Sequence, residues 1–483
     1  MDWFVKKEKL LLTIIFIWIV FVALWHLPTN PPSWFDEGIF HQVITSLVNN
    51  GRMSVQLAPG VWSESALISV GYPVFYPAVA AFYLFNDSVL VLRLVAVAFL
   101  FGLVIFYYRL AKTVYGTRSA ILSLLLLALF SPLYGNGKNF LGEVPGLFYF
   151  VTALSVLAVA ENMRRRELIS YRRFFIAGLF FGLAAASKPN FLVIIPAIIC
   201  AFLWQWRWSL GATSGRRAFF VTGLGVALPL IFWAFTQFTG ATSSSQIFAH
   251  YSNPYYINDF WPIISRNLQR FFTESTPAHF LFLAIAALYL LYVKVWQRRP
   301  LALVEITVVA FVGAIFLFYV RTAGWYRYFF PAHVMLFIFL PQALEYFFTS
   351  RAGRYASVLL VSAVAGLAIF QTLPMIQERF HSGADVPTLF QPVLDSVDSS
   401  ENALFYSLPQ LAARFHGSNY AQYIKMSDHL ALGEDNLARL RRGEFSLVFM
   451  EAGVDASAFS CYNLNEILYG IRILRRIPSA DCP

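Results

Sequence analysis

The feature that most constrains this chain is a series of long apolar stretches separated by short polar segments. Hydrophobic residues make up 58% of the sequence and charged residues 13%, whereas about a quarter of a soluble domain is charged. The hydrocarbon core of a bilayer is about 30 Å thick, so a helix needs roughly 20 apolar residues to cross it. We therefore predict a polytopic α-helical membrane protein with about eleven transmembrane helices, near residues 10–27, 88–109, 118–134, 143–160, 174–187, 190–206, 218–238, 279–296, 301–320, 329–348 and 355–374.

The distribution of basic residues predicts the orientation of these helices. Lys6, Lys7 and Lys9 precede the first span, and the alternate gaps that follow it hold most of the other clustered cations. Because cytoplasmic loops are enriched in Lys and Arg, the N-terminus is expected in the cytoplasm. With an odd number of spans, the C-terminus is then extracytoplasmic. The same clustering excludes nucleic acid as the partner of this chain, although its net charge is +10. We expect a multi-pass protein of the inner or plasma membrane of a bacterial or archaeal cell.

Two parts of different character follow from the pattern. Residues 1–376 are expected to form a transmembrane catalytic domain, whose first outer loop, 28–87, contains interfacial helices. Residues 377–483 are expected to form a small extracytoplasmic soluble α/β domain, because short apolar strands alternate there with polar helical segments. Within it, we expect strands over 402–407 and 445–450 and a helix over 430–442. The second long outer region, 239–278, has the composition of a polar loop.

Two cysteines, Cys461 and Cys482, fall in this polar C-terminal region. An oxidising compartment permits a disulfide between them. The spacing does not establish the pairing, so both states stay open.

Acidic residues stand at the outer ends of two predicted spans. Asp36 and Glu37 follow the first span, and Glu143 opens the fourth from the same side. Ionisable groups at membrane depth are costly and mark functional sites, and a carboxylate can accept a proton from a hydroxyl group. We expect Asp36 and Glu143 to be catalytic and Glu37 to contribute to substrate binding. Helix capping is the structural alternative for each acid, and a divalent cation held by Asp36 and Glu143 is a further one.

Several cations lie on the outer side, where the topology disfavours them. The most unexpected is Lys188, in the tight turn between the fifth and sixth spans. A cation in this position suggests an anionic partner, because charge-assisted hydrogen bonds to phosphate are strong. Snorkelling to lipid phosphates is the alternative for any one of them. The residues that we expect to bind a phosphate or diphosphate are Lys138, Lys188, Arg321 and Arg327, together with Tyr328.

These motifs, in this order, resemble the GT-C glycosyltransferases, in particular the branch of protein O-mannosyltransferases and aminoarabinose (lipid A) transferases. The resemblance covers about residues 1–374. It is carried by the acidic pair Asp36-Glu37, by Leu92-Arg93-Leu, by Glu143-Val-Pro, by the glycine-rich segment from Gly178 to Lys188, and by Arg327-Tyr-Phe-Phe-Pro.

The resemblance implies an enzyme that moves one sugar from a polyprenyl-monophosphate donor to an acceptor on the periplasmic or lumenal face, with inversion. Asp36 would be the general base, and Lys188 and Arg327 would bind the donor phosphate. The acceptor could be a lipid, a glycan or a protein, and some branches need a divalent cation. Two alternatives remain: a transporter or flippase of lipid-linked sugars, and a glycan ligase or polymerase that uses a polyprenyl-diphosphate donor. The sequence does not identify the sugar, the prenyl chain length or the oligomeric state.

Overall fold

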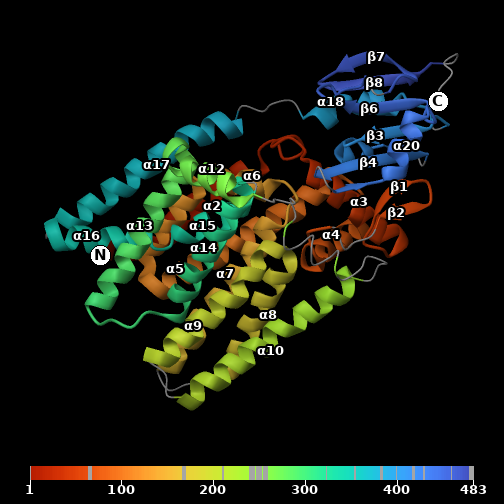
Figure 1. Cartoon of the computed structure of the whole chain (residues 1–483). Helices are drawn as coiled ribbons and strands as arrows, with labels where there is room; N and C mark the ends of the chain where they lie inside the picture. Colours follow the sequence, from red (N-terminus) through yellow and green to blue (C-terminus); the bar gives the residue numbers. More distant parts are fainter. Residues whose placement is uncertain are drawn as a thin grey trace.

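A helical bundle and a mixed β-sheet make up the protein, and the first outer loop lies between them (Figure 1). The computed structural model describes residues 2–63, 68–165, 170–208, 212–238, 245, 253, 259–322, 324–352, 355–380, 385–398, 400–415, 419–427, 430–457 and 459–477.

The bundle is built from apolar helices whose buried residues form one large core. Its long helices are α2 (Glu8–Leu24), α5 (Val89–Ala128), α7 (Glu143–Arg165), α8 (Tyr171–Ser187), α9 (Ile194–Trp208), α10 (Ala212–Gln237), α13 (Ser275–Trp296), α14 (Leu303–Arg321), α15 (Tyr326–Leu336), α16 (Leu340–Ala352) and α17 (Ala356–Phe380). Shorter elements connect them: α1 (Asp2–Lys6), α6 (Ser131–Lys138), η2 (Pro189–Val193) and α12 (Phe260–Thr273).

Seven helices of the described residues are long and apolar enough to cross a membrane, or eight if the bent pair α15–α16 is one span. This confirms a polytopic helical membrane protein, whereas the count of eleven stays a prediction. The difference has a geometric origin. Element α5 has 40 residues and consists of two helices that meet at Gly116, so it covers two predicted spans. Its backbone breaks at Gly116, which has a φ of 84°. Helices α2 and α8 have 17 residues each.

Helices α8 and α10 approach each other closely because glycines line their contact. A methyl group on Gly178 would collide with the carbonyl oxygen of Thr222, and one on Gly182 with that of Val226. Small residues four apart allow such backbone contact in membranes. This contact fixes the end of α8, where Lys188 follows.

The first outer loop contains α3 (Phe35–Asn50), the hairpin β1 (Val55–Ala58) and β2 (Val61–Ser63), and α4 (Tyr72–Leu84). Helix α3 packs against α4 on one side and against α19 of the C-terminal part on another. At Gly38 the approach is so close that a Cβ would collide with the backbone of Gln410. Protein therefore covers two sides of α3, and the interfacial location predicted for this loop stays a prediction.

A six-stranded sheet forms the C-terminal part, in the order β5-β4-β3-β6-β8-β7. Strand β3 pairs in parallel with β4 and β6, and the other pairs are antiparallel. The strands are β3 (Ala403–Tyr406), β4 (Tyr420–Ser427), β5 (Leu430–Leu432), β6 (Leu447–Glu451), β7 (Tyr462–Leu468) and β8 (Ile471–Arg476), and the helices are α18 (Val386–Asp395), α19 (Pro409–Ala412) and α20 (Glu434–Arg441).

The sheet confirms the α/β character of this part and the two predicted strands, which are β3 and β6. The predicted helix over 430–442 is too long, because Leu430–Leu432 is strand β5 and Gly433, with a φ of 79°, precedes α20. The outer region 239–278 is also not a simple loop, since it includes α12. The domain boundary at 376–377 stays a prediction. Cys482 lies outside the described residues, so a disulfide between it and Cys461 also stays a prediction.

Candidate active site

Asp36 lies in the first turn of α3, where the chain leaves an extended conformation at Trp34. An acidic residue in a first turn interacts favourably with the helix dipole. Here its side chain does more, because Oδ2 accepts a hydrogen bond from Nη1 of Arg327, at the start of α15. The side chains keep 20% and 16% of their exposure, respectively. The pair is therefore accessible from outside while being largely surrounded by protein.

Glu143 begins α7 and forms a second pair with Lys188, the residue that ends α8. Lys188 Nζ donates to Glu143 Oε1 at 2.5 Å, and both side chains are buried. The other oxygen of Glu143, Oε2, has no hydrogen-bond partner among the described residues. A buried charge pair costs desolvation energy that its mutual attraction only partly offsets. Its presence beside an accessible pair therefore points to function.

Tyr328 connects the two pairs. Its hydroxyl accepts a hydrogen bond from Arg327 Nη2 at 3.2 Å, and its ring centroid lies 5.6 Å from Lys188 Nζ. The Arg327 guanidinium also lies 5.9 Å from the ring of Trp34 and 5.4 Å from that of Trp325. Such cation–π contacts hold a cation without neutralising it. The site thus contains two carboxylates and two cations, and both cations contact aromatic rings.

Glu37 points away from this cluster. Its oxygens accept two hydrogen bonds from Arg93, at 3.0 and 2.7 Å, and one from the backbone N–H of Phe140 at 3.1 Å. Arg93 is fully buried and also donates to the carbonyl oxygens of Leu27 and Pro31. This pair anchors α3 to α5 and to the preceding loop. A substrate-binding role for Glu37 stays a prediction.

The other two predicted cations differ in their surroundings. Lys138 is buried, and its Nζ donates to the carbonyl oxygen of Trp25 at 2.5 Å. Arg321 is exposed, with its guanidinium 4.7 Å from the ring of Phe260. The phosphate-binding roles of both residues stay predictions.

The sequence reading gave no role to the aromatic pair Trp34 and Trp325, whose rings lie 6.5 Å apart edge to face. A signal was present, since each lies two residues from a charged residue of the site. The described residues contain no group of three or more His, Cys, Asp or Glu side chains that could hold a metal ion, and Asp36 and Glu143 each face a cation. A divalent cation held by these two carboxylates stays a prediction.

Comparison with known proteins gives a family-model match and similar solved structures. Residues 73–233 match the family model described as dolichyl-phosphate-mannose-protein mannosyltransferase. Among solved structures, ArnT from Cupriavidus metallidurans is similar in the apo state, with a TM-score of 0.62, 11% identity and 98% of each chain covered. Its complex with undecaprenyl phosphate gives a TM-score of 0.61 at 12% identity, again over 98% of each chain.

A third similar structure is the oligosaccharyltransferase AglB from Archaeoglobus fulgidus, in complex with an inhibitory peptide and a dolichol-phosphate. Its TM-score is 0.60 at 14% identity, with 93% of this chain and 70% of that chain covered. No curated protein sequence matches the chain. The family-model match over residues 73–233 and the shared fold together support a membrane glycosyltransferase of the GT-C class.

Proposed function

We propose that the protein transfers a single sugar from a polyprenyl-monophosphate donor to an acceptor hydroxyl on the outer face of the membrane. The observation that carries this proposal is the cluster of two carboxylate–cation pairs joined through Tyr328. The family model and the similar structures support the donor class, because their descriptions name dolichyl-phosphate-mannose, undecaprenyl phosphate and dolichol-phosphate.

In the proposed reaction, Asp36 accepts the proton of the acceptor hydroxyl while the oxygen of that hydroxyl attacks the anomeric carbon of the donor sugar. The bond between that carbon and the phosphate oxygen breaks, and polyprenyl phosphate leaves with the electron pair. Attack from the side opposite the leaving group inverts the anomeric configuration. Arg327 and Lys188 stabilise the negative charge that develops on the phosphate, as prearranged cations do in other transfer reactions.

The two ion pairs suggest how donor binding prepares the base. In the structure Arg327 holds Asp36, and Lys188 holds Glu143. A donor phosphate that binds Arg327 competes with Asp36 for this cation, and the exchange leaves an oxygen of Asp36 open to the acceptor. Lys188 can contact the phosphate while Glu143 continues to position its side chain. Sugar binding and base activation are thereby coupled.

The distribution of Lys and Arg supports an N-terminus in the cytoplasm and a site on the periplasmic or lumenal side. The acceptor would then be a lipid, glycan or protein of that compartment. Two alternatives to this proposal remain. A flippase would move the lipid-linked sugar across the bilayer without transferring it, and a ligase or polymerase would take its glycan from a polyprenyl-diphosphate donor.

The test is sugar transfer in proteoliposomes with a set of radiolabelled polyprenyl-phosphate sugars. Asp36→Asn keeps the size of the side chain but cannot take the proton, so transfer should fall by about 10²–10⁴-fold. Asp398→Asn, an exposed change in the C-terminal part, is the matched control and should keep full activity.

Transfer that survives in Asp36→Asn would move the catalytic role to Glu143. Lipid movement across the bilayer without any transfer would favour the flippase. Transfer only from polyprenyl-diphosphate glycans would favour the ligase or polymerase.

A further inference from the structure

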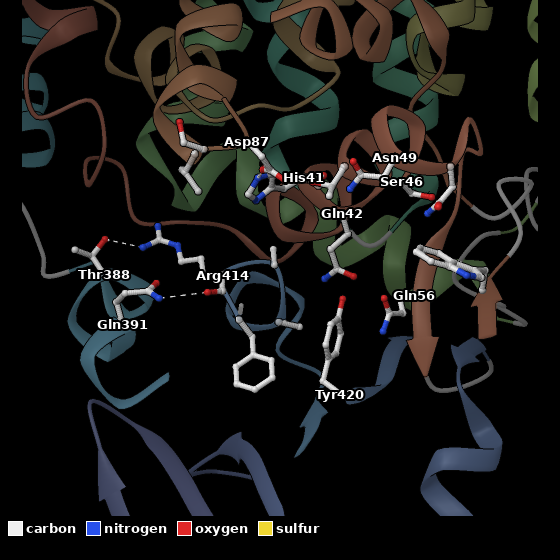
Figure 2. A pocket seen from close by; sticks show the side chains of 18 of the residues that line it. His41, Gln42, Ser46, Asn49, Gln56, Asp87, Thr388, Gln391, Arg414 and Tyr420 are labelled. Carbon is white, nitrogen blue, oxygen red and sulfur yellow. Dashed lines mark hydrogen bonds and ion pairs between the residues drawn. The ribbon is translucent and has the colours of Figure 1, made fainter. Parts of the chain in front are cut away.

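A polar cavity lies between the first outer loop and the C-terminal part. Figure 2 shows side chains of α3 on one side of it and Arg414, Gln391 and Tyr420 of the C-terminal part on the other. Its volume is about 630 Å³, within the range of small-molecule sites. Thr45, which lines it, is about two and a half turns from Asp36 at 3.6 residues per turn, so the two point to opposite faces of α3. The cavity is therefore separate from the candidate active site.

The charged residues that line this cavity are paired. Arg414 contacts Asp385 at 3.1 Å and donates to Thr388 Oγ1 at 2.9 Å. Asp87 accepts hydrogen bonds from His41 Nε2 and, at 2.7 Å, from Thr45 Oγ1. Since Arg414 is paired with Asp385 and Asp87 already accepts two hydrogen bonds, neither charged group is free to select an ion. An uncharged polar ligand fits it better.

Several neutral groups at the cavity are open for hydrogen bonding. His41 is buried, and its Nδ1 has no partner among the described residues. Burial raises the pKa of Tyr420 to about 12, so at neutral pH its hydroxyl keeps the proton and can both donate and accept. No hydrogen bond is described for that hydroxyl, nor for the side-chain amides of Asn49 and Gln56. An amide offers a donor and an acceptor at one position.

The cavity also has aromatic walls. Trp62, Phe415 and Tyr420 line it alongside the amides. A sugar presents hydroxyl groups that donate and accept around its rim, and a C–H face that packs on aromatic rings. We propose that this cavity is a carbohydrate-binding site for an uncharged glycan. Resting on the proposed function, that glycan is a part of the acceptor remote from the reacting hydroxyl, because the donor sugar and the acceptor hydroxyl must both lie at Asp36.

The test is binding of the purified full-length protein to an array of neutral oligosaccharides, followed by calorimetry with the strongest binder. Ala413→Trp places an indole in the cavity without removing a polar group, and it should weaken binding more than tenfold. Tyr420→Phe removes one hydroxyl and should weaken binding about three- to tenfold. Tyr469→Phe removes a hydroxyl from an exposed residue in the turn between β7 and β8 and should bind as wild type does.

Absence of binding by wild-type protein to every oligosaccharide would overturn the proposal. So would binding that Ala413→Trp leaves unchanged, provided that its unfolding temperature matches wild type. Asp36→Asn should bind the oligosaccharide normally even though it transfers no sugar. This variant separates the two proposals, since glycan binding can fail while transfer stands, and the reverse.

Discussion

The neighbouring acids Asp36 and Glu37 should respond to the same change in opposite ways. Glu37→Gln keeps the shape of the side chain but leaves the fully buried Arg93 without a counter-charge. Removing one partner of a buried ion pair typically costs about 3–5 kcal/mol of folding free energy. We expect the loss to lie at the upper end of this range, because Glu37 also accepts a hydrogen bond from the backbone N–H of Phe140. Asp36→Asn affects a partly exposed pair, and we expect it to cost about 1 kcal/mol.

The assay is thermal unfolding in detergent, with donor KM measured on the same preparations. Glu37→Gln should lower Tm by several degrees, whereas Asp36→Asn should leave Tm nearly unchanged and abolish transfer. The double variant Glu37→Leu/Arg93→Met should recover part of the stability, since it removes both buried charges together. The reasoning is refuted if Glu37→Gln unfolds with wild-type Tm while its donor KM rises, because Glu37 would then be a substrate-binding residue.

Three further predictions follow from other contacts. Lys188→Ala should weaken donor binding and also destabilise the fold, because it leaves Glu143 buried and unpaired. Adding Glu143→Gln should restore the unfolding temperature, whereas the donor affinity of the purified double variant should stay low. Gly178→Leu should separate α8 from α10 and prevent recovery of folded protein, judged by size-exclusion chromatography, whereas Gly223→Leu on α10 faces open space and should be tolerated. Burial raises the pKa of Tyr420 from 10.0 to about 12, so the unfolded chain loses this proton at a lower pH than the folded protein does. Wild type should therefore lose stability as pH rises from 10 to 12, and Tyr420→Phe should lose less. Chemical denaturation at each pH measures both.

The membrane part could be anticipated because a bilayer imposes a length and an apolar composition on every span. The exact count stays a prediction, because α5 combines two predicted spans in one element whose backbone is non-helical at Gly116. The helical segment around Leu430 was misassigned for a different reason. Its polar pattern suits a helix, but pairing with β4 holds the first three residues in a strand.

The candidate site shows the same division. Unusual location marked Asp36, Glu143, Lys188 and Arg327, because charges at membrane depth are costly. Which acid pairs with which cation depends on contacts between residues far apart in the sequence, and these appear only in the fold. The sequence placed Glu37 in the same site as Asp36, as a substrate-binding residue beside the base. Their positions one residue apart on a helix turn them by about 100°, so one meets Arg327 and the other Arg93.

The contact between α3 and the C-terminal sheet has a consequence for biogenesis. Gln422, on β4, exchanges hydrogen bonds with Gln42 of α3 and donates to the backbone oxygen of Gln56 on β1. Asn436 donates to the backbone oxygen of Leu57 in the same hairpin. These partners are synthesised long after the loop that they complete. During synthesis the first outer loop therefore exists before these partners do. The Gln42 amide and the carbonyl oxygens of Gln56 and Leu57 gain these hydrogen bonds only when the sheet has folded onto the loop.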